Sequence, residues 1–324
     1  MSVLIILHEL GHYWAARAFD IRVLRFSIGF GPTLLSHTRG ETQWQIALLP
    51  FGGFVQVDGL GLREDDVVND ERNYRNKAAW QRAIFVFAGP LVNWLLAAAF
   101  IAGLGMTAGI MQPLSSATIG VVGDDTPAAR AGLLIGDEIV RVDGELIAGW
   151  EGLVSAIGEH RDRDMTLTVK RGPETLEIVA RPQDGRLGVG VAQRRVRYGV
   201  GESIGAGIGY AWNGSGQLVQ LLWGMLSGTR SGEFSGVPRI VQVLSSQAQE
   251  GVDRLIQTLA WLSVTLCVLN LTPIPAVDGG RLLFIALEVA RGRPTPEHIE
   301  ATIHGVGMMI LLGFALFLAI RDVI

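Results

Sequence analysis

Two histidines and a glutamate near the start of the chain form the pattern His8-Glu9-Leu10-Gly11-His12. On a helix, residues four positions apart lie on one face, so both imidazoles can reach one ion at about 2.0–2.1 Å from each nitrogen. Glu9 lies one position round the helix, where its carboxylate can act as a general base on a water in the open position of the ion. The spacing therefore predicts a hydrolytic metal site.

The same five-residue pattern also occurs by chance on surface helices. Here the residues directly before it, Val3 to Leu7, are all apolar. Burying a carboxylate and two imidazoles among apolar residues costs free energy unless these groups have a partner or a function. The flanking sequence therefore favours a metal site over an accidental match.

The composition indicates a membrane protein. Of the 324 residues, 49% are hydrophobic and only 18% are charged, and the mean hydropathy is +0.34. These values are too apolar for an ordinary soluble enzyme, and the length suits two or three units. A formal net charge of −4, without a stretch that combines dense Lys and Arg with aromatic residues, predicts no nucleic-acid partner. The single cysteine, Cys267, cannot form an internal disulfide.

The predicted fold is an α-helical polytopic membrane protein of about four transmembrane helices. Residues 1–20 form the first transmembrane helix, and three further spans are expected at 81–112, 255–290 and 300–321, where long runs lack charged residues. The intervening region 21–80 is rich in Arg and is expected on the cytoplasmic side by the positive-inside rule. Residues 200–254 are expected to form interfacial or amphipathic helices, because 203–229 lacks charge but is rich in Gly and polar amides. If that segment spanned the membrane instead, the orientation of everything after it would reverse.

The region 21–80 is expected to contain a membrane-associated β-hairpin. The stretch from Glu41 to Val57 is β-prone on both sides of Pro50 and the pair Gly52-Gly53. A plain surface hairpin is the alternative. The apolar core of the stretch favours a hairpin that enters the membrane interface.

Residues 117–192 are expected to form an inserted α+β domain with short alternating strands. Its Pro127–Leu133 stretch, followed by Gly136–Gly144, resembles a PDZ domain. Near its end, Leu187-Gly188-Val189 resembles the carboxylate-binding loop of a circularly permuted PDZ domain. Such a groove would bind an extended peptide or a chain end. The alternative is a steric spacer that binds nothing, because a fold does not dictate a function.

A second polar constellation follows the third span. Pro273 and Pro275 end or unwind a helix there. An acidic residue beside a broken helix is placed to line a polar cavity, so Asp278 is the expected third metal ligand. His304 could also ligate metal, although an interhelical hydrogen bond is the more ordinary role. Asn93 is open between an interhelical hydrogen bond and a role in the active site.

Several motifs together resemble the site-2 protease family (M50), in particular its bacterial RseP-type branch with a PDZ insert. These motifs are His8–His12, the GFGP of Gly29–Pro32, the AGPLVN of Ala88–Asn93, the PDZ-like insert and the NLTPIPAVDGG of Asn270–Gly280. The resemblance implies a zinc intramembrane protease that cleaves single-pass membrane proteins in regulated intramembrane proteolysis. Its substrates would be proteins like anti-sigma factors or remnants of signal peptides. The implied location is the bacterial inner membrane, with the PDZ domain in the periplasm and the active site towards the cytoplasm.

The resemblance also implies roles for individual residues. Zn²⁺ would be held by His8, His12 and Asp278, and Glu9 would be the base. Asn270 would lie near the scissile carbonyl or steady the substrate. The hairpin would hold the substrate extended by edge pairing, because a helical backbone is closed to hydrolysis. The residues expected to do so are Gln43, Ile46, Leu48, Gly52 and Gly53.

Three other functions compete with this interpretation. A catalytically silent membrane receptor or scaffold, sensing chains through its PDZ domain, would not need Glu9. A metal transporter using the same histidines predicts further acidic or His residues at membrane depth, where the sequence offers little beyond Asp278 and His304. A soluble peptidase would leave the charge-free runs without an apolar environment to face.

Overall fold

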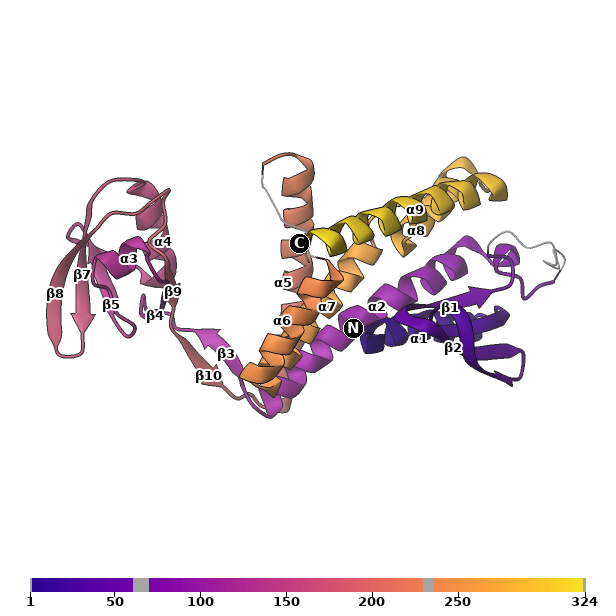
Figure 1. The fold of residues 1–324 in the computed structure, drawn as a ribbon, viewed down its shortest axis with the longest axis horizontal. Coiled ribbons are helices and arrows are strands. Elements are labelled where there is room, and N and C mark those ends of the chain that lie inside the picture. Colours follow the sequence, from indigo (N-terminus) through magenta and orange to yellow (C-terminus); the bar gives the residue numbers. More distant parts are fainter. Residues whose placement is uncertain (1, 61–69, 230–235, 323–324) are drawn as a thin grey trace. The chain divides into compact units, whose positions relative to one another are not determined.

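The computed structural model describes residues 2–60, 70–229 and 236–322. The chain forms two compact units, one made of Met1–Met106 with Gly199–Ile324 and the other of Thr107–Tyr198. The first unit is mostly helical and carries one hairpin, and the second is mostly strands (Figure 1). Each unit is described by itself below.

The first unit begins with helix α1 (Ser2–Ala18) and a hairpin of β1 (Val23–Arg39) and β2 (Thr42–Val57), which lies beside α1 (Figure 1). Both strands bend back on themselves. Ser27 of β1, for example, pairs with Gln45 on one side and with Phe54 on the other. Gly29 and Gly52 lie at the bends with φ angles of 89° and 120°, which residues with a side chain rarely adopt. The first half of β1 is therefore an interior strand, and the last residues of β2 form an edge.

Three helices among the described residues are long and apolar enough to cross a membrane. They are α2 (Ala79–Met106), α7 (Val252–Asn270) and α9 (Glu297–Arg321). They overlap the segments 81–112, 255–290 and 300–321, where charge-free runs predict spans, and each begins two or three residues earlier. Helix α1 has 17 residues, fewer than the roughly 20 that a span needs. The first predicted span, residues 1–20, therefore stays a prediction.

Helices α5 (Val200–Leu226) and α6 (Val237–Glu250) follow the second unit in the sequence. Small residues on one face of α5 allow it to approach α2 closely, because a Cβ on Gly207 would lie 3.0 Å from the carbonyl carbon of Ala98. Another face of α5 exposes large apolar side chains, including Trp212 and Trp223. An exposed apolar face on a helix that also carries polar amides is typical of a helix at a membrane interface.

Helix α8 (Asp278–Arg291) starts with the acidic residue of the proline-rich loop and ends at Gly292, which has the left-handed φ of 68°. Near its end, Glu288 binds Arg82 of α2 through two hydrogen bonds of 3.0 and 2.5 Å. A short 3₁₀ helix, η1 (Tyr74–Asn76), precedes α2, and the ring of Tyr74 lies 5.8 Å from the guanidinium carbon of Arg82. These contacts attach α8 to the start of α2.

The second unit contains a four-stranded antiparallel sheet in the order β6-β5-β7-β8 and two separate strand pairs, β4 with β9 and β3 with β10. Its helices α3 and α4 pack on a core that includes Leu153, Leu167 and Leu187, each at most 2% exposed. The element bounds are β3 Ile110–Pro113, β4 Ile119–Val122, α3 Pro127–Arg130, β5 Glu138–Val142, β6 Glu145–Leu146, α4 Gly149–Glu159, β7 Met165–Arg171, β8 Glu174–Ala180, β9 Val189–Val191 and β10 Gln193–Val196.

Candidate active site

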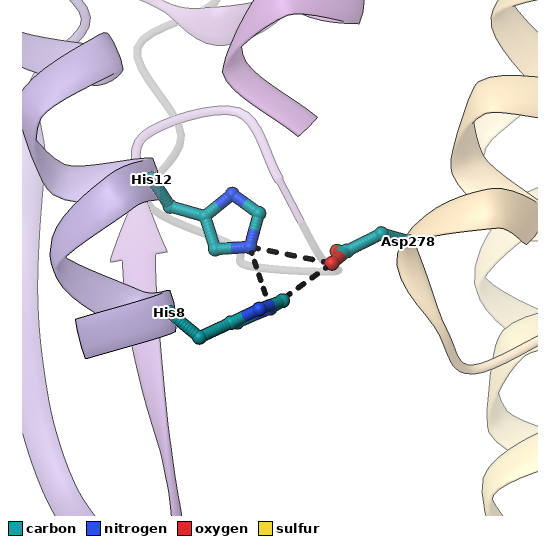
Figure 2. A group of neighbouring side chains, drawn as sticks. All are labelled: His8, His12 and Asp278. Carbon is teal, nitrogen blue, oxygen red and sulfur yellow. Dashed lines mark hydrogen bonds and ion pairs between the residues drawn. The ribbon is translucent and has the colours of Figure 1, made fainter. Parts of the chain in front are cut away.

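Three side chains from two distant parts of the sequence meet in the first unit. His8 and His12 lie one turn apart on α1, and Asp278 is the first residue of α8 (Figure 2). The two Nε2 atoms are 3.2 Å apart, and Oδ2 of Asp278 lies 3.1 Å from His8 Nε2 and 3.4 Å from His12 Nε2. Both histidines are buried, with 7% and 6% of their surface exposed. The convergence predicted for these residues is thus present.

The triangle of donor atoms has the size that a zinc ion requires. In a tetrahedral shell with bonds of about 2.0–2.1 Å, neighbouring ligand atoms are about 3.3–3.4 Å apart. The three observed distances, 3.1 to 3.4 Å, match one face of such a shell. Two imidazoles and a carboxylate are also ordinary zinc ligands, and three protein ligands leave the fourth position open.

Space for an ion depends on a glycine of α2. A Cβ built on Gly89 would lie 2.8 Å from His8 Nε2 and closer still to His12 Nε2. Any larger residue would therefore enter the space between the two imidazoles. Gly11 of α1 allows α2 to approach this closely, because a Cβ on Gly11 would lie 2.9 Å from the carbonyl carbon of Ala88 and would keep the two helices apart.

The second nitrogen of His12 fixes its tautomer. Nδ1 lies 2.9 Å from the carbonyl oxygen of Phe85, so Nδ1 must carry the hydrogen and donate it. Nε2 then presents a lone pair towards His8 and Asp278. Histidine ligands of zinc in general donate their other N–H in this way, which fixes the ring and makes the ligand nitrogen more basic.

Asn93 of α2 gives His8 the equivalent support. Its buried side-chain amide lies 3.2 Å from His8 Nδ1, while Oδ1 has no hydrogen-bond partner. Because the two ends of an amide have the same shape, a half-turn places Oδ1 against Nδ1–H of His8 and leaves His8 Nε2 free to ligate. Ser263 of α7 also donates to the backbone oxygen of Asn93, at 2.9 Å. The contact between Asn93 and His8 joins α2 to α1 and lies at the three-residue cluster, so it combines the two roles left open for Asn93.

The last residues of β2 surround Glu9. The backbone N–H of Val55 donates a hydrogen bond to the Glu9 carboxylate. A Cβ on Gly53 would lie 3.3 Å from Cγ of Glu9 and 2.8 Å from the backbone oxygen of Ser27. The carboxylate is therefore held between α1 and the edge of the hairpin, on the same helical turn as the two imidazoles.

The other residues predicted for the substrate site lie in three places: within the hairpin, on its exposed surface and at the end of α7. Gln43 and Ile46 lie in the part of β2 that pairs with β1 on both sides, Ile46 with Ile28 and with Leu35. Their backbone groups are therefore used within the sheet. Leu48 is 52% exposed, and Asn270 is the last residue of α7.

Two contributors to the site lack a signal in the sequence. The carbonyl of Phe85 and the N–H of Val55 are backbone groups, which nearly every residue carries whatever its side chain. Only the packing of α1 against α2 and β2 brings them to the histidine and the glutamate. Gly89 could have been found from the sequence, because a glycine inside an apolar helix marks a close approach.

Comparison with known proteins decides the family. A family model described as peptidase family M50 matches residues 1–314. The chain belongs to peptidase family M50. It is therefore an intramembrane zinc metalloprotease. His8 and His12 of α1 lie within the matched region of this M50 peptidase.

Relatives of this M50 peptidase cover nearly all of the chain. A predicted zinc metalloprotease of Agrobacterium fabrum is 31% identical over 100% of this chain and 93% of its own length. Another, of a Nostoc species, is 33% identical over 99% and 93%. RasP of Bacillus subtilis, named as the regulator of sigma-W protease, is 28% identical over 99% and 96%. These similarities extend over the whole M50 peptidase, including its second unit.

Proposed function

We propose that this M50 peptidase hydrolyses a peptide bond in single-pass membrane proteins, with His8, His12 and Asp278 as zinc ligands and Glu9 as general base. The observation that carries the proposal is the convergence of three ligand atoms within 3.4 Å of one another, with Glu9 next in sequence to the first of them. When bound, zinc supplies Lewis-acid chemistry that polarises a carbonyl and acidifies a water.

The side chains of the protein itself have separate tasks in this proposal. Glu9 accepts the proton of the attacking water and delivers it to the leaving amine, as a general base and then acid. The N–H of Val55 keeps the carboxylate of Glu9 oriented towards that water. Phe85 and Asn93 fix the rings of His12 and His8. Asn270, at the end of the helix that leads to the proline-rich loop, contacts the carbonyl side of the substrate strand.

The substrate strand is proposed to pair with the free edge of β2. Residues 53–57 pair with β1 on one side only among the described strands, and this edge includes Gly53 and Val55 beside Glu9. An extended segment added there would lie alongside the base, which edge pairing achieves through backbone hydrogen bonds. Gly52, Gly53 and Leu48 keep their proposed contact with substrate. Gln43 and Ile46 support the sheet instead, because both of their edges are occupied.

The substrates are proposed to be membrane-spanning segments with the chemistry of anti-sigma factors or signal-peptide remnants. The similarity to RasP supports this class, because that protein is named for its action in sigma-factor regulation. The three apolar helices support an enzyme of the bacterial inner membrane. The active site would face the cytoplasm, on the side of the Arg-rich region that contains the hairpin.

The second unit is proposed to be a single periplasmic PDZ domain that binds a peptide or a chain end. Strand β9 pairs only with β4 among the described strands, which leaves one edge for an added strand. Leu187 is buried in the core of this unit, and Gly188 has a φ of 78°, which favours glycine. Val189 then begins β9, so Leu187, Gly188 and Val189 would bind the terminal carboxylate.

The test compares zinc content and cleavage of a model transmembrane substrate for the intact protein and two variants. Glu9→Gln should keep zinc and lose about 10²–10⁴-fold in turnover, because only the proton transfer is removed. Asp278→Ala should lose both zinc and turnover. Equal cleavage by wild type and Glu9→Gln would remove Glu9 as the base. Absence of cleavage by the wild-type protein would leave a membrane receptor as the better function.

A further inference from the structure

The loop that leads to Asp278 contains a strained residue. Ala276, two positions before the proposed ligand, has a φ of 80°. Alanine rarely adopts this left-handed region because its Cβ approaches the backbone, and such strain persists only where the surroundings enforce it. The value is that of the third residue of a type II turn, a position normally occupied by glycine and often preceded by proline, as Pro275 precedes Ala276 here.

Helix α9 contacts the strained residue directly. Nδ1 of His304 accepts a hydrogen bond from the backbone N–H of Ala276, at 2.9 Å. One turn further along, Gly307 lies against Pro275, because a Cβ on Gly307 would be 2.6 Å from the proline Cβ. The two contacts lie on one face of α9 and hold two successive residues of the loop.

Helix α8 closes the loop from the opposite side. The N–H of Gly280 donates to the backbone oxygen of Val277 at 3.1 Å. A Cβ on Gly280 would lie 3.1 Å from Cα of Pro275 and still closer to the oxygen of Ile274. The loop is thus enclosed between α8 and α9, and the backbone conformation at Ala276 determines where α8 begins and where Asp278 points.

We propose that His304 is a positioning residue of the metal site. By accepting the N–H of Ala276, it holds the loop in the strained conformation that brings the Asp278 carboxylate to His8 and His12. His304 is not a ligand in this proposal, because its Nδ1 accepts the backbone N–H of Ala276 and the hydrogen of the neutral ring is then on Nε2. The inference rests on the proposed assignment of Asp278 as a zinc ligand, and it gives the histidine of α9 a role in metal affinity.

Three substitutions of His304 test whether a side-chain atom at the position of Nδ1 must accept the N–H of Ala276. His304→Asn keeps an acceptor, Oδ1, at the place of Nδ1, whereas His304→Gln moves the acceptor one bond further out and His304→Leu removes it. Zinc affinity of the full-length protein in detergent is measured by competition with a chromogenic chelator. The Leu and Gln variants should bind zinc about tenfold more weakly, the scale of losing an outer partner of a metal site, and the Asn variant should be near wild type.

A glycine at position 276 tests the strain itself. Glycine adopts a positive φ at no steric cost, so Ala276→Gly should restore most of the zinc affinity that His304→Leu loses. In the wild-type background the same change should have little effect. This non-additivity is the signature of two residues that act on one conformation.

The outcomes separate this inference from the proposed function. Zinc retained at wild-type affinity in Asp278→Ala would remove Asp278 as a ligand and with it the proposed metal site. Zinc lost in Asp278→Ala but bound normally by His304→Leu would overturn the positioning role alone. An Asn variant as weak as the Leu variant would do the same, because the acceptor would then not matter. If His304→Leu does not fold, the Asn and Gln variants decide the question.

Discussion

At the scale of single residues, the active site depends as much on missing side chains as on present ones. His8 and His12 are placed by helical spacing, which any HExxH helix provides. The space between their nitrogens exists because Gly89 lacks a Cβ, and the orientation of each ring is set by a partner on α2. Substitutions of Gly89 and of Asn93 test these two features.

Gly89→Ala should abolish zinc binding, because the added Cβ would lie 2.8 Å or less from the Nε2 atoms of both histidines. Gly103→Ala is the matched control in the same helix, since a Cβ there meets nothing within 4 Å and alanine favours the helix. Zinc content by atomic emission should distinguish the two proteins. Full zinc occupancy in Gly89→Ala would show that the ion binds elsewhere.

Asn93→Leu should weaken zinc binding about 10–100-fold, the usual cost of removing a group that orients a histidine ligand. Asn93→Asp should bind zinc at least as well as wild type, because a carboxylate accepts the N–H of His8 more strongly than an amide does. Chelator competition measures both. Equal affinities in the Leu and Asp variants would mean that Asn93 only fills space.

At the scale of elements, the site lies where α1, the start of α8 and the edge of β2 meet. Helix α8 brings Asp278 at its first turn and is fastened at its other end, where Glu288 binds Arg82 of α2. The edge of β2 holds the carboxylate of Glu9 in place. Helix α8 therefore has a functional first turn and an anchoring contact near its other end.

Arg82→Ala should destabilise the protein by about 1–3 kcal/mol, because Glu288 is left with fewer partners in a site where both side chains are mostly buried. The side chains of Arg82 and Glu288 are 12% and 22% exposed. Arg291→Ala, at the exposed end of α8, should change stability by no more than about 0.5 kcal/mol. Thermal unfolding in detergent measures both, and similar midpoints would argue against an anchoring role.

Gly53→Ala should lower turnover about tenfold or more without loss of zinc. The added Cβ would lie 2.8 Å from the oxygen of Ser27 and 3.3 Å from Glu9 Cγ, so the edge and the base must shift, and a small displacement of a catalytic group is costly. Gly31→Ala in β1 is a control, because its Cβ would meet only Leu49 at 3.9 Å, although its φ of 87° adds strain. Cleavage assays with parallel zinc measurement decide the matter, and unaltered turnover in Gly53→Ala would count against this edge.

At the scale of the whole molecule, the second unit has its own core and its own electrostatic support. Asp137 is 1% exposed and binds Arg171 through two hydrogen bonds of 2.8 Å. The hydrogen bond from Arg171 lowers the pKa of the Asp137 carboxyl, and the N–H of Leu134 adds to this effect. The pair joins the loop before β5 to the end of β7.

The stability of the second unit should therefore fall in acid. Because the pKa of Asp137 is lower in the folded state, its contribution is fully present above the usual carboxyl pKa near 4 and is lost as the pH falls through the lowered value. Arg171→Leu should lower stability at neutral pH and flatten this acid dependence. Arg130→Leu, which removes an exposed pair with Asp125, should do neither. Amide hydrogen exchange of this unit in the whole protein is the measurement.

Much of the protein could be predicted from the sequence, because local rules govern those parts. Charge-free runs predict α2, α7 and α9, since a bilayer requires long apolar helices. Spacing predicts that His8 and His12 share a face, and the prolines predict the break before Asp278. The sequence does not separate the edge of β2 from its interior part, since Gln43 and Ile46 are as β-prone as the residues at the edge.

The sequence alone thus determined which residues can bind metal and which segments can cross a membrane, because both follow from residue type and short-range periodicity. Only the tertiary structure decided that Asp278 meets two histidines some 270 positions earlier, that Val55 rather than Ile46 lies at the edge beside Glu9, and that His304 binds a strained amide. Those results depend on backbone groups and on contacts between distant segments, which leave no local pattern in the order of the residues.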